Sequence, residues 1–127
     1  NDMLRDVVYT EAGDARRRLF HQRALEVLEA AQASAGVLAH HAQAAGLQQA
    51  TFRHSLTAGQ EALRVLAVNE ALVHLEQAYQ LIREAVLTEP PSKADLQRLY
   101  MQLGRAYKLS GQPEKALAVA SEKDRLV

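Results

Sequence analysis

The five histidines are the residues of this chain best suited to proton transfer or metal binding. His40 and His41 are adjacent, and a helix projects adjacent side chains in different directions, whereas a helical metal-binding pair needs a spacing of three or four residues. Four positions from either one, the sequence has only Gly36, Val37, Ala44 and Ala45. His21, His54 and His74 are isolated in the sequence. We therefore expect histidines on helix faces or between helices, and no metal site.

The sequence also lacks the residue patterns of nucleophilic and acid–base catalysis. The chain has no cysteine, and its few serines are not accompanied by a pattern of histidine and acid. The glutamates at 26 and 29, and those at 70 and 76, are typical of exposed helix surfaces. We expect neither an enzyme nor a cofactor.

A run of three arginines, Arg16, Arg17 and Arg18, could hold a phosphate group. The run is expected near the start of a helix, where three cations oppose the helix dipole. Lys and Arg together number 15, as do Asp and Glu, so the net charge is zero and there is no wider basic field. We expect these arginines to face solvent or an adjacent domain, without direct contact with nucleic acid.

The composition points to a helical protein. Alanine and leucine, both strong helix formers, are abundant, while aromatic residues make up 5% and tryptophan is absent. No apolar run is long enough to cross a membrane, and no apolar segment of the signal-peptide kind opens the chain. We expect an all-α, cytoplasmic protein with no membrane partner.

Apolar residues recur with a helical period along most of the chain, which predicts six helices and no strand. Gly13 and Asp14 suggest a break before the first long helix, with Asp14 as its N-cap. Asn69 is the expected cap of the fourth helix, and Ser92 with Asp95 forms a capping box for the fifth. The expected helices run from about 15 to 32, 35 to 45, 48 to 66, 70 to 87, 92 to 109 and 113 to 123.

Glycine and proline mark several of the expected helix ends. Gly46 and Gly111 follow the second and fifth helices and are expected to close them. Pro90 and Pro91 interrupt the chain before the fifth helix, and Pro113 suits the first turn of the sixth. Short connections of this kind predict three antiparallel helical hairpins.

Two stretches carry small and large residues at the same spacing. They are Gly59, Ala62, Ala71, Leu75 and Ala78 in the first, and Tyr100, Leu103, Gly104, Tyr107 and Ala116 in the second. Small residues at fixed offsets let paired helices approach closely, and this pattern resembles the tetratricopeptide repeat, a helical hairpin of about 34 residues. The resemblance implies a right-handed α-solenoid of about three antiparallel helical hairpins.

The resemblance also suggests how the chain divides. We expect a single tetratricopeptide-like helical domain over 1–127, with 1–14 as a junction from a preceding domain, 15–46 as a degenerate hairpin, and 48–87 and 92–125 as repeats. Ala120 and Lys123 depart from the pattern, because the last repeat should have a bulky apolar residue and an alanine there. The last helix is therefore interpreted as a capping or truncated one.

The front of the chain carries a second resemblance. Residues 2–9, 15–21, 38–41 and 45–46 are similar to the junction that leads from the nucleotide-binding module into the tetratricopeptide region of bacterial signal-transduction ATPases, which include LuxR-type, MalT-like transcriptional regulators. The resemblance implies a scaffold and sensor segment, with Arg16, Arg17 and Arg18 contacting the adjacent domain. The chain begins with Asn1 and ends directly after a helical pattern, so we expect a segment of a longer protein. It has no phosphate-binding loop and no recognisable DNA-reading helix, so ATP chemistry and DNA binding are not implied for it.

In such a solenoid the first helix of each hairpin lines a concave face. The register predicts a cationic groove with apolar floor positions, formed by Arg53, Leu56, Gln60, Leu63, Arg64, Arg98, Met101, Arg105, Lys108 and Leu109. Such a groove could bind an acidic peptide, a neighbouring domain or a partner protein. The alternatives are that these arginines only solvate an exposed face, that the segment senses a small inducer as MalT-like proteins do, or that it forms a homodimer.

Overall fold

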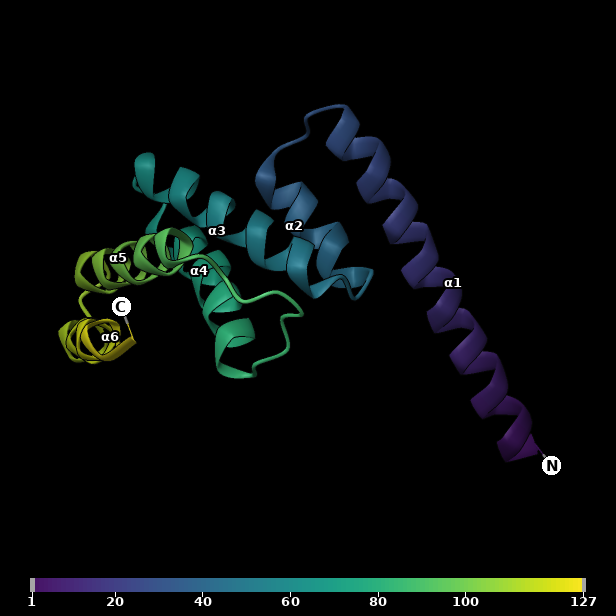
Figure 1. The fold of residues 1–127 in the computed structure, drawn as a ribbon. Helices are drawn as coiled ribbons and strands as arrows, with labels where there is room; N and C mark the ends of the chain where they lie inside the picture. The colour runs from purple at the N-terminus through teal and green to yellow at the C-terminus, as the bar shows by residue number, and fades with distance from the viewer. Residues whose placement is uncertain (1, 127) are drawn as a thin grey trace.

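The computed structural model describes the backbone of residues 2–126 and the side chains of all of these except 2, 4 and 6–9. This part of the chain is all-α, as predicted, and contains no strand. Its six helices are α1 (Asp2–Ala30), α2 (Ala35–Ala44), α3 (Gln48–Arg64), α4 (Val68–Arg83), α5 (Lys93–Leu109) and α6 (Pro113–Leu126) (Figure 1). None of these helices combines the length and the apolarity needed to cross a lipid bilayer.

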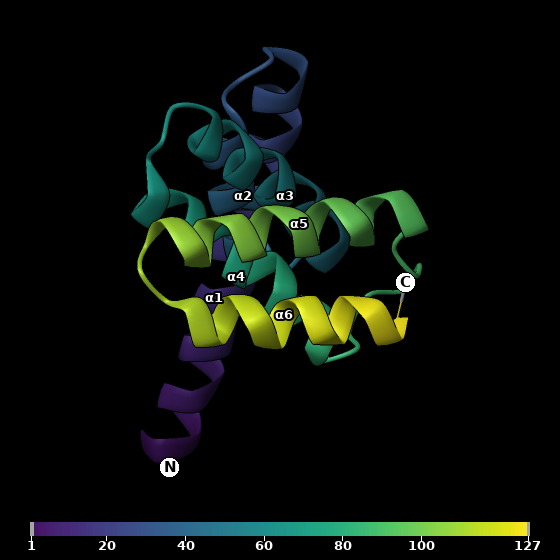
Figure 2. The same ribbon diagram turned by 90° about the vertical axis from the view of Figure 1, so that its left-hand side faces the viewer.

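The helices are arranged mainly in chain order. Each one packs against the next along the chain, and α3 also contacts α5. Figure 2 shows α5 and α6 side by side and antiparallel, and Figure 1 shows them at the end of the molecule opposite α1. The contacts therefore progress from α1 at one end to α6 at the other.

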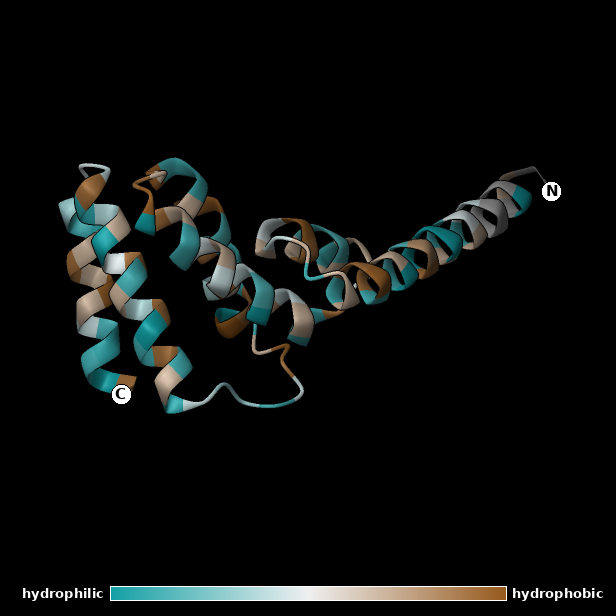
Figure 3. Cartoon of the chain, turned by 90° about the horizontal axis from the view of Figure 1, so that it is seen from above, coloured by the Kyte–Doolittle hydropathy of each residue, from teal (hydrophilic) through white to brown (hydrophobic). Residues whose placement is uncertain are grey.

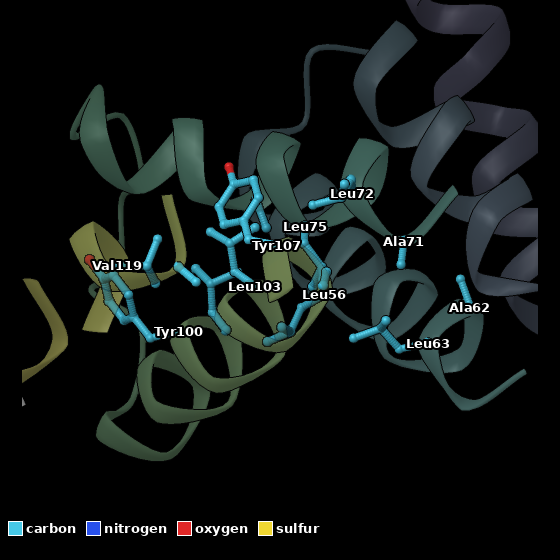
Figure 4. Packing of buried hydrophobic residues seen from close by; sticks show 14 of the residues in the cluster. Leu56, Ala62, Leu63, Ala71, Leu72, Leu75, Tyr100, Leu103, Tyr107 and Val119 are labelled. Carbon is cyan, nitrogen blue, oxygen red and sulfur yellow. The ribbon is translucent and has the colours of Figure 1, made fainter. Parts of the chain in front are cut away.

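The core has two parts. The larger cluster of buried residues is shared by α3, α4, α5 and α6, and it includes Leu56, Leu75, Leu99, Leu103 and Tyr100 (Figure 4). A smaller cluster joins α1 to α2. Its buried residues are Leu25, Leu38 and Ala42. Because both clusters lie between successive helices, each interhelical contact buries its own apolar surface.

The long first helix differs from the prediction. The expected break at Gly13 and the N-cap at Asp14 are wrong, because α1 runs without interruption from Asp2 to Ala30. A glycine inside a helix costs only about 1 kcal/mol relative to alanine, so it does not by itself end the helix. Residues 15–20 are all exposed, and the N-terminal half of α1 extends away from the other helices (Figure 3).

The turns between helices share one hydrogen-bonding pattern. Gly46 and Gly111 adopt positive φ angles of 74° and 75°, as predicted for residues that close a helix. Leu66 adopts the same conformation, with φ 60°. Its N–H bonds to the carbonyl of Leu63, and the next N–H bonds to the carbonyl of Ala62, which completes a Schellman motif.

The predicted helix starts are partly correct. Ser92 caps α5, since its Oγ accepts a bond of 3.1 Å from the N–H of Asp95. Asn69 does not cap α4, because the helix already begins at Val68 and Ala67 occupies the cap position. The Schellman motif before α4 sets this earlier start, because it turns the chain without a capping side chain.

Candidate functional site

A surface groove runs between α5 and α6, on the face that these two helices present away from α3 and α4. Its volume is about 380 Å³. The residues that line it are Tyr100, Met101, Gly104, Arg105, Lys108, Ala116, Ala120 and Lys123. This groove is the candidate site, and it is called the α5–α6 groove below.

The groove exists because one large side chain is missing. In the α3–α4 hairpin, a Cβ placed on Gly59 would lie 2.5 Å from Cγ and Cδ2 of Leu75, so the leucine fills the space above the glycine. Gly104 is the equivalent glycine of the α5–α6 hairpin, and a Cβ placed there would meet nothing within 4 Å. The residue equivalent to Leu75 is Ala120, which is exposed. A small residue opposite a glycine leaves the groove open.

At two further pairs of equivalent positions, the residue is buried in the α3–α4 hairpin and exposed in the α5–α6 hairpin. Leu56 and Leu63 of α3 are buried, with exposed fractions of 3% and 1%. Their equivalents on α5 are Met101, which is 60% exposed, and Lys108, which is also exposed. The face that is covered in the α3–α4 hairpin is therefore open to solvent in the α5–α6 hairpin.

The chemistry of the groove combines small apolar walls with positive charge. Arg105, Lys108 and Lys123 contribute three cations, and no acidic residue is among the lining residues. Tyr100 also lines the groove, and its hydroxyl donates a hydrogen bond of 3.1 Å to Glu122 Oε1. Burial, together with that carboxylate, raises the pKa of Tyr100. The groove is shaped to take a large apolar side chain with acidic groups beside it.

The structure brings three of the predicted groove residues together, namely Met101, Arg105 and Lys108. Leu56 is buried in the core and cannot contact a partner, so its assignment to the groove is wrong. Leu63 is buried in the same way.

The remaining predicted groove residues of α3 and α5 lie elsewhere. Arg53 pairs with Glu29 at 3.3 Å, at the end of α1. Arg98 pairs with Asp95 at 2.7 Å and donates a bond of 3.4 Å to Gln60. Arg64 is exposed in the last turn of α3, and Leu109 is half exposed at the end of α5. These residues do not form one continuous groove with the α5–α6 site.

The three arginines expected at a helix start lie in the middle of α1 instead. The helix dipole therefore does not act on them as expected, because its effect is confined to the terminal turns. Arg17 pairs with Asp14 at 3.5 Å, and both are exposed. Arg16 lines an apolar surface pocket of α1 with Leu19 and Phe20, while Arg18 packs near Gly46.

The histidines are less isolated than their sequence positions indicate. His21 Nδ1 and His41 Nδ1 are 2.8 Å apart, and His40 lies beside both rings. Burial is the main cause that lowers the pKa of His41, with a smaller effect of the neighbouring histidines. His54 contacts Glu29 at 3.0 Å. His21 and His54, although isolated in the sequence, therefore have close polar neighbours in the fold.

The sequence pattern does not place Lys123 in the groove, although Ala120 and Lys123 both depart from the repeat. The signal was present, because a small residue in place of a bulky one opposite a glycine implies an open space.

Comparison with known proteins adds no further assignment. No protein-family model matches this sequence, and no curated protein or solved structure is significantly similar to it.

Proposed function

We propose that the chain is a tetratricopeptide-like interaction module. Its two C-terminal hairpins keep one register, in which Gly59 corresponds to Gly104 and Ala71 to Ala116. Both alanines are buried, with exposed fractions of 0% and 4%. The positive-φ turn after the first helix also falls at the same register position in both hairpins. Equal spacing of the close-packed residues and of the turn supports two copies of one repeat.

The function that the geometry supports best is binding of a helical protein segment in the α5–α6 groove. The single observation behind this proposal is the open space in front of Gly104, where Ala120 replaces the leucine of the preceding hairpin. In a transcriptional regulator of the kind that the sequence resembles, the bound segment would belong to a partner protein or to a neighbouring domain of the same chain.

The preceding hairpin suggests how the segment docks. Helix α5 packs on α3 and α4, where Arg98 of α5 donates a hydrogen bond to Gln60. The residue equivalent to Gln60 on α5 is Arg105, which is exposed. A partner helix lying on α5 and α6 as α5 lies on α3 and α4 would therefore bring an acceptor to Arg105. Because Arg105, Lys108 and Lys123 surround the position, an acidic residue is the favoured acceptor.

A peptide-display selection on the purified chain tests this function. We expect enriched helical peptides to carry a large apolar residue flanked by Asp or Glu. Ala120→Leu, which fills the groove and leaves its charges in place, should weaken binding of the selected peptides at least tenfold, and so should Arg105→Glu with Lys108→Glu. Arg64→Glu is the matched control, because it reverses an exposed arginine outside the groove.

Selected peptides that bind Ala120→Leu as tightly as the original chain would refute the groove as the binding site. Light scattering of the free chain identifies a second copy as the occupant if a dimer forms that Ala120→Leu dissociates.

A surface pocket with several amide and carboxylate side chains in its lining favours a second candidate function, the sensing of a small molecule. This pocket lies where α2, α3 and α4 meet and has a volume of about 620 Å³. Its polar lining includes Gln43, Gln77, Gln80, Glu76 and Glu84. Amide and carboxylate groups of this density suit a hydroxylated metabolite. A thermal-shift screen of sugars and polyols, repeated on Gln80→Leu, should show stabilisation that this variant loses.

A further inference from the structure

The geometry points to a binding site for one divalent transition-metal ion where α1 crosses α2, formed by His21, His40 and His41. One ring nitrogen from each of the three histidines lies within 4.8 Å of the other two. His21 comes from α1 and the other two come from α2, so the site joins two helices. It lies at the opposite end of the molecule from the α5–α6 groove and is independent of the proposed function.

The nitrogen positions are close to those that a bound ion requires. A tetrahedral ion about 2.05 Å from each nitrogen would hold the nitrogens about 3.3 Å apart. His21 Nδ1 and His41 Nδ1, at 2.8 Å, need to separate slightly, and the exposed His40 needs to move inward. Both changes are small, because the three ring nitrogens already lie within 4.8 Å of one another.

The ion would replace a hydrogen bond that already holds the two rings together. Between His21 Nδ1 and His41 Nδ1, one nitrogen must carry the proton and the other must accept it. If that proton moves to Nε2 of the same ring, both Nδ1 atoms offer a lone pair. Two neutral imidazoles then become ligands without any change in total charge.

The ligand set selects the class of metal. Imidazole nitrogen favours Zn²⁺, Ni²⁺, Co²⁺ and Cu²⁺, whereas Mg²⁺ and Ca²⁺ prefer oxygen ligands. Three histidines leave a fourth position of a tetrahedral ion for water, on the exposed side of His40. Arg17 and Arg18 lie one turn before His21, and their positive charges repel the ion. We therefore expect an affinity in the micromolar range.

Calorimetric titration of the untagged chain with ZnCl₂ is the direct test. We expect one ion per chain, and the same site titrated with CoCl₂ should give the visible absorption bands of four-coordinate Co²⁺. His21→Ala, His40→Ala and His41→Ala should each weaken Zn²⁺ binding about tenfold or more. His54→Gln is the matched control, because His54 pairs with Glu29 away from the site, and it should bind Zn²⁺ like the original chain.

Because His40 is exposed, its substitution leaves the buried α1–α2 cluster of Leu25, Leu38 and Ala42 in place. The test therefore stays decisive even if the other two variants unfold. Circular dichroism confirms that each variant is folded. Absence of saturable binding at millimolar Zn²⁺ would overturn the proposal. Equal affinity of His40→Ala and the original chain, or loss of binding in His54→Gln alone, would overturn it as well.

Discussion

Leu75 lies directly over Gly59, so close that a Cβ on the glycine would be 2.5 Å from two of the leucine's carbon atoms. Gly59→Ala should therefore destabilise the fold by about 1–3 kcal/mol through overpacking between α3 and α4. Gly104→Ala is the matched control at the equivalent position, where the added methyl group meets nothing within 4 Å. It should stabilise the chain by about 0.5–1 kcal/mol, because alanine is the better helix former. Urea unfolding measures the change in stability of each variant. Changes of the same sign in the two variants would contradict the packing difference.

Leu66 occupies a left-handed backbone conformation that glycine adopts more easily. Leu66→Gly should raise the free energy of unfolding by about 1 kcal/mol, because it removes the strain at the turn and the leucine side chain is 63% exposed. The reverse change at the equivalent position of the α5–α6 hairpin, Gly111→Ala, should lower the free energy of unfolding by a similar amount. Thermal unfolding of the two variants checks the prediction, which fails if Leu66→Gly is the less stable one.

Glu122 connects α6 to two other helices. Its carboxylate accepts hydrogen bonds from the hydroxyls of Tyr79, at 2.5 Å, and Tyr100, at 3.1 Å. Hydrogen bonds to charged groups contribute about 1.5–3 kcal/mol, so Glu122→Ala should destabilise the fold by about that amount. The neighbouring exposed Asp124→Ala serves as the control and should stay within about 0.5 kcal/mol of the original chain. Urea midpoints at neutral pH compare the two variants.

Two buried tyrosines and one partly buried tyrosine should make the fold sensitive to alkali. Burial, reinforced by the bonds to Glu122 and Glu76, raises the pKa values of Tyr79, Tyr100 and Tyr107 in the folded chain. A raised pKa in the folded state gives stability that is complete below the unfolded value of about 10 and is lost as the pH rises above it.

The urea midpoint should therefore be constant from about pH 8 to 9 and fall above about pH 10. Tyr107→Phe removes one of the three titrating groups. The urea midpoint of this variant should therefore fall less steeply over that pH range. A midpoint that rises with pH above the tyrosine pKa would contradict the direction of these shifts.

Most of the fold was predictable because the residues that begin and end its helices act locally. Ser92, Gly46 and Gly111 act through their own turns, and each one marked its helix end correctly. Gly13 was misleading, because an isolated glycine lowers helix stability without supplying the alternative hydrogen bonds that end a helix. The start of α4 depends on Leu66, a residue type that carries no turn signal in a sequence.

The candidate sites were less predictable, because they depend on which helices cover one another. The register placed Leu56 and Met101 on the same kind of face, yet one is buried and the other is exposed. The histidine cluster depends on the pairing of α1 with α2. Leu25 packs with Leu38, and moving one turn further from the connecting loop on each helix leads to His21 and His41. That relationship becomes visible only after the two helices are aligned.

The length of α1 gives it the mechanics of a lever. Its 29 residues span about 44 Å at about 1.5 Å per residue, and the contacts with α2 are made near the C-terminal end. A tilt of about 10° at those contacts would move a point about 30 Å along the helix by roughly 5 Å. His21, His40 and His41 lie at the α1–α2 contact about which α1 would tilt. An ion bound there would fix the angle between the two helices, and with it the position of anything held by the N-terminal part of α1.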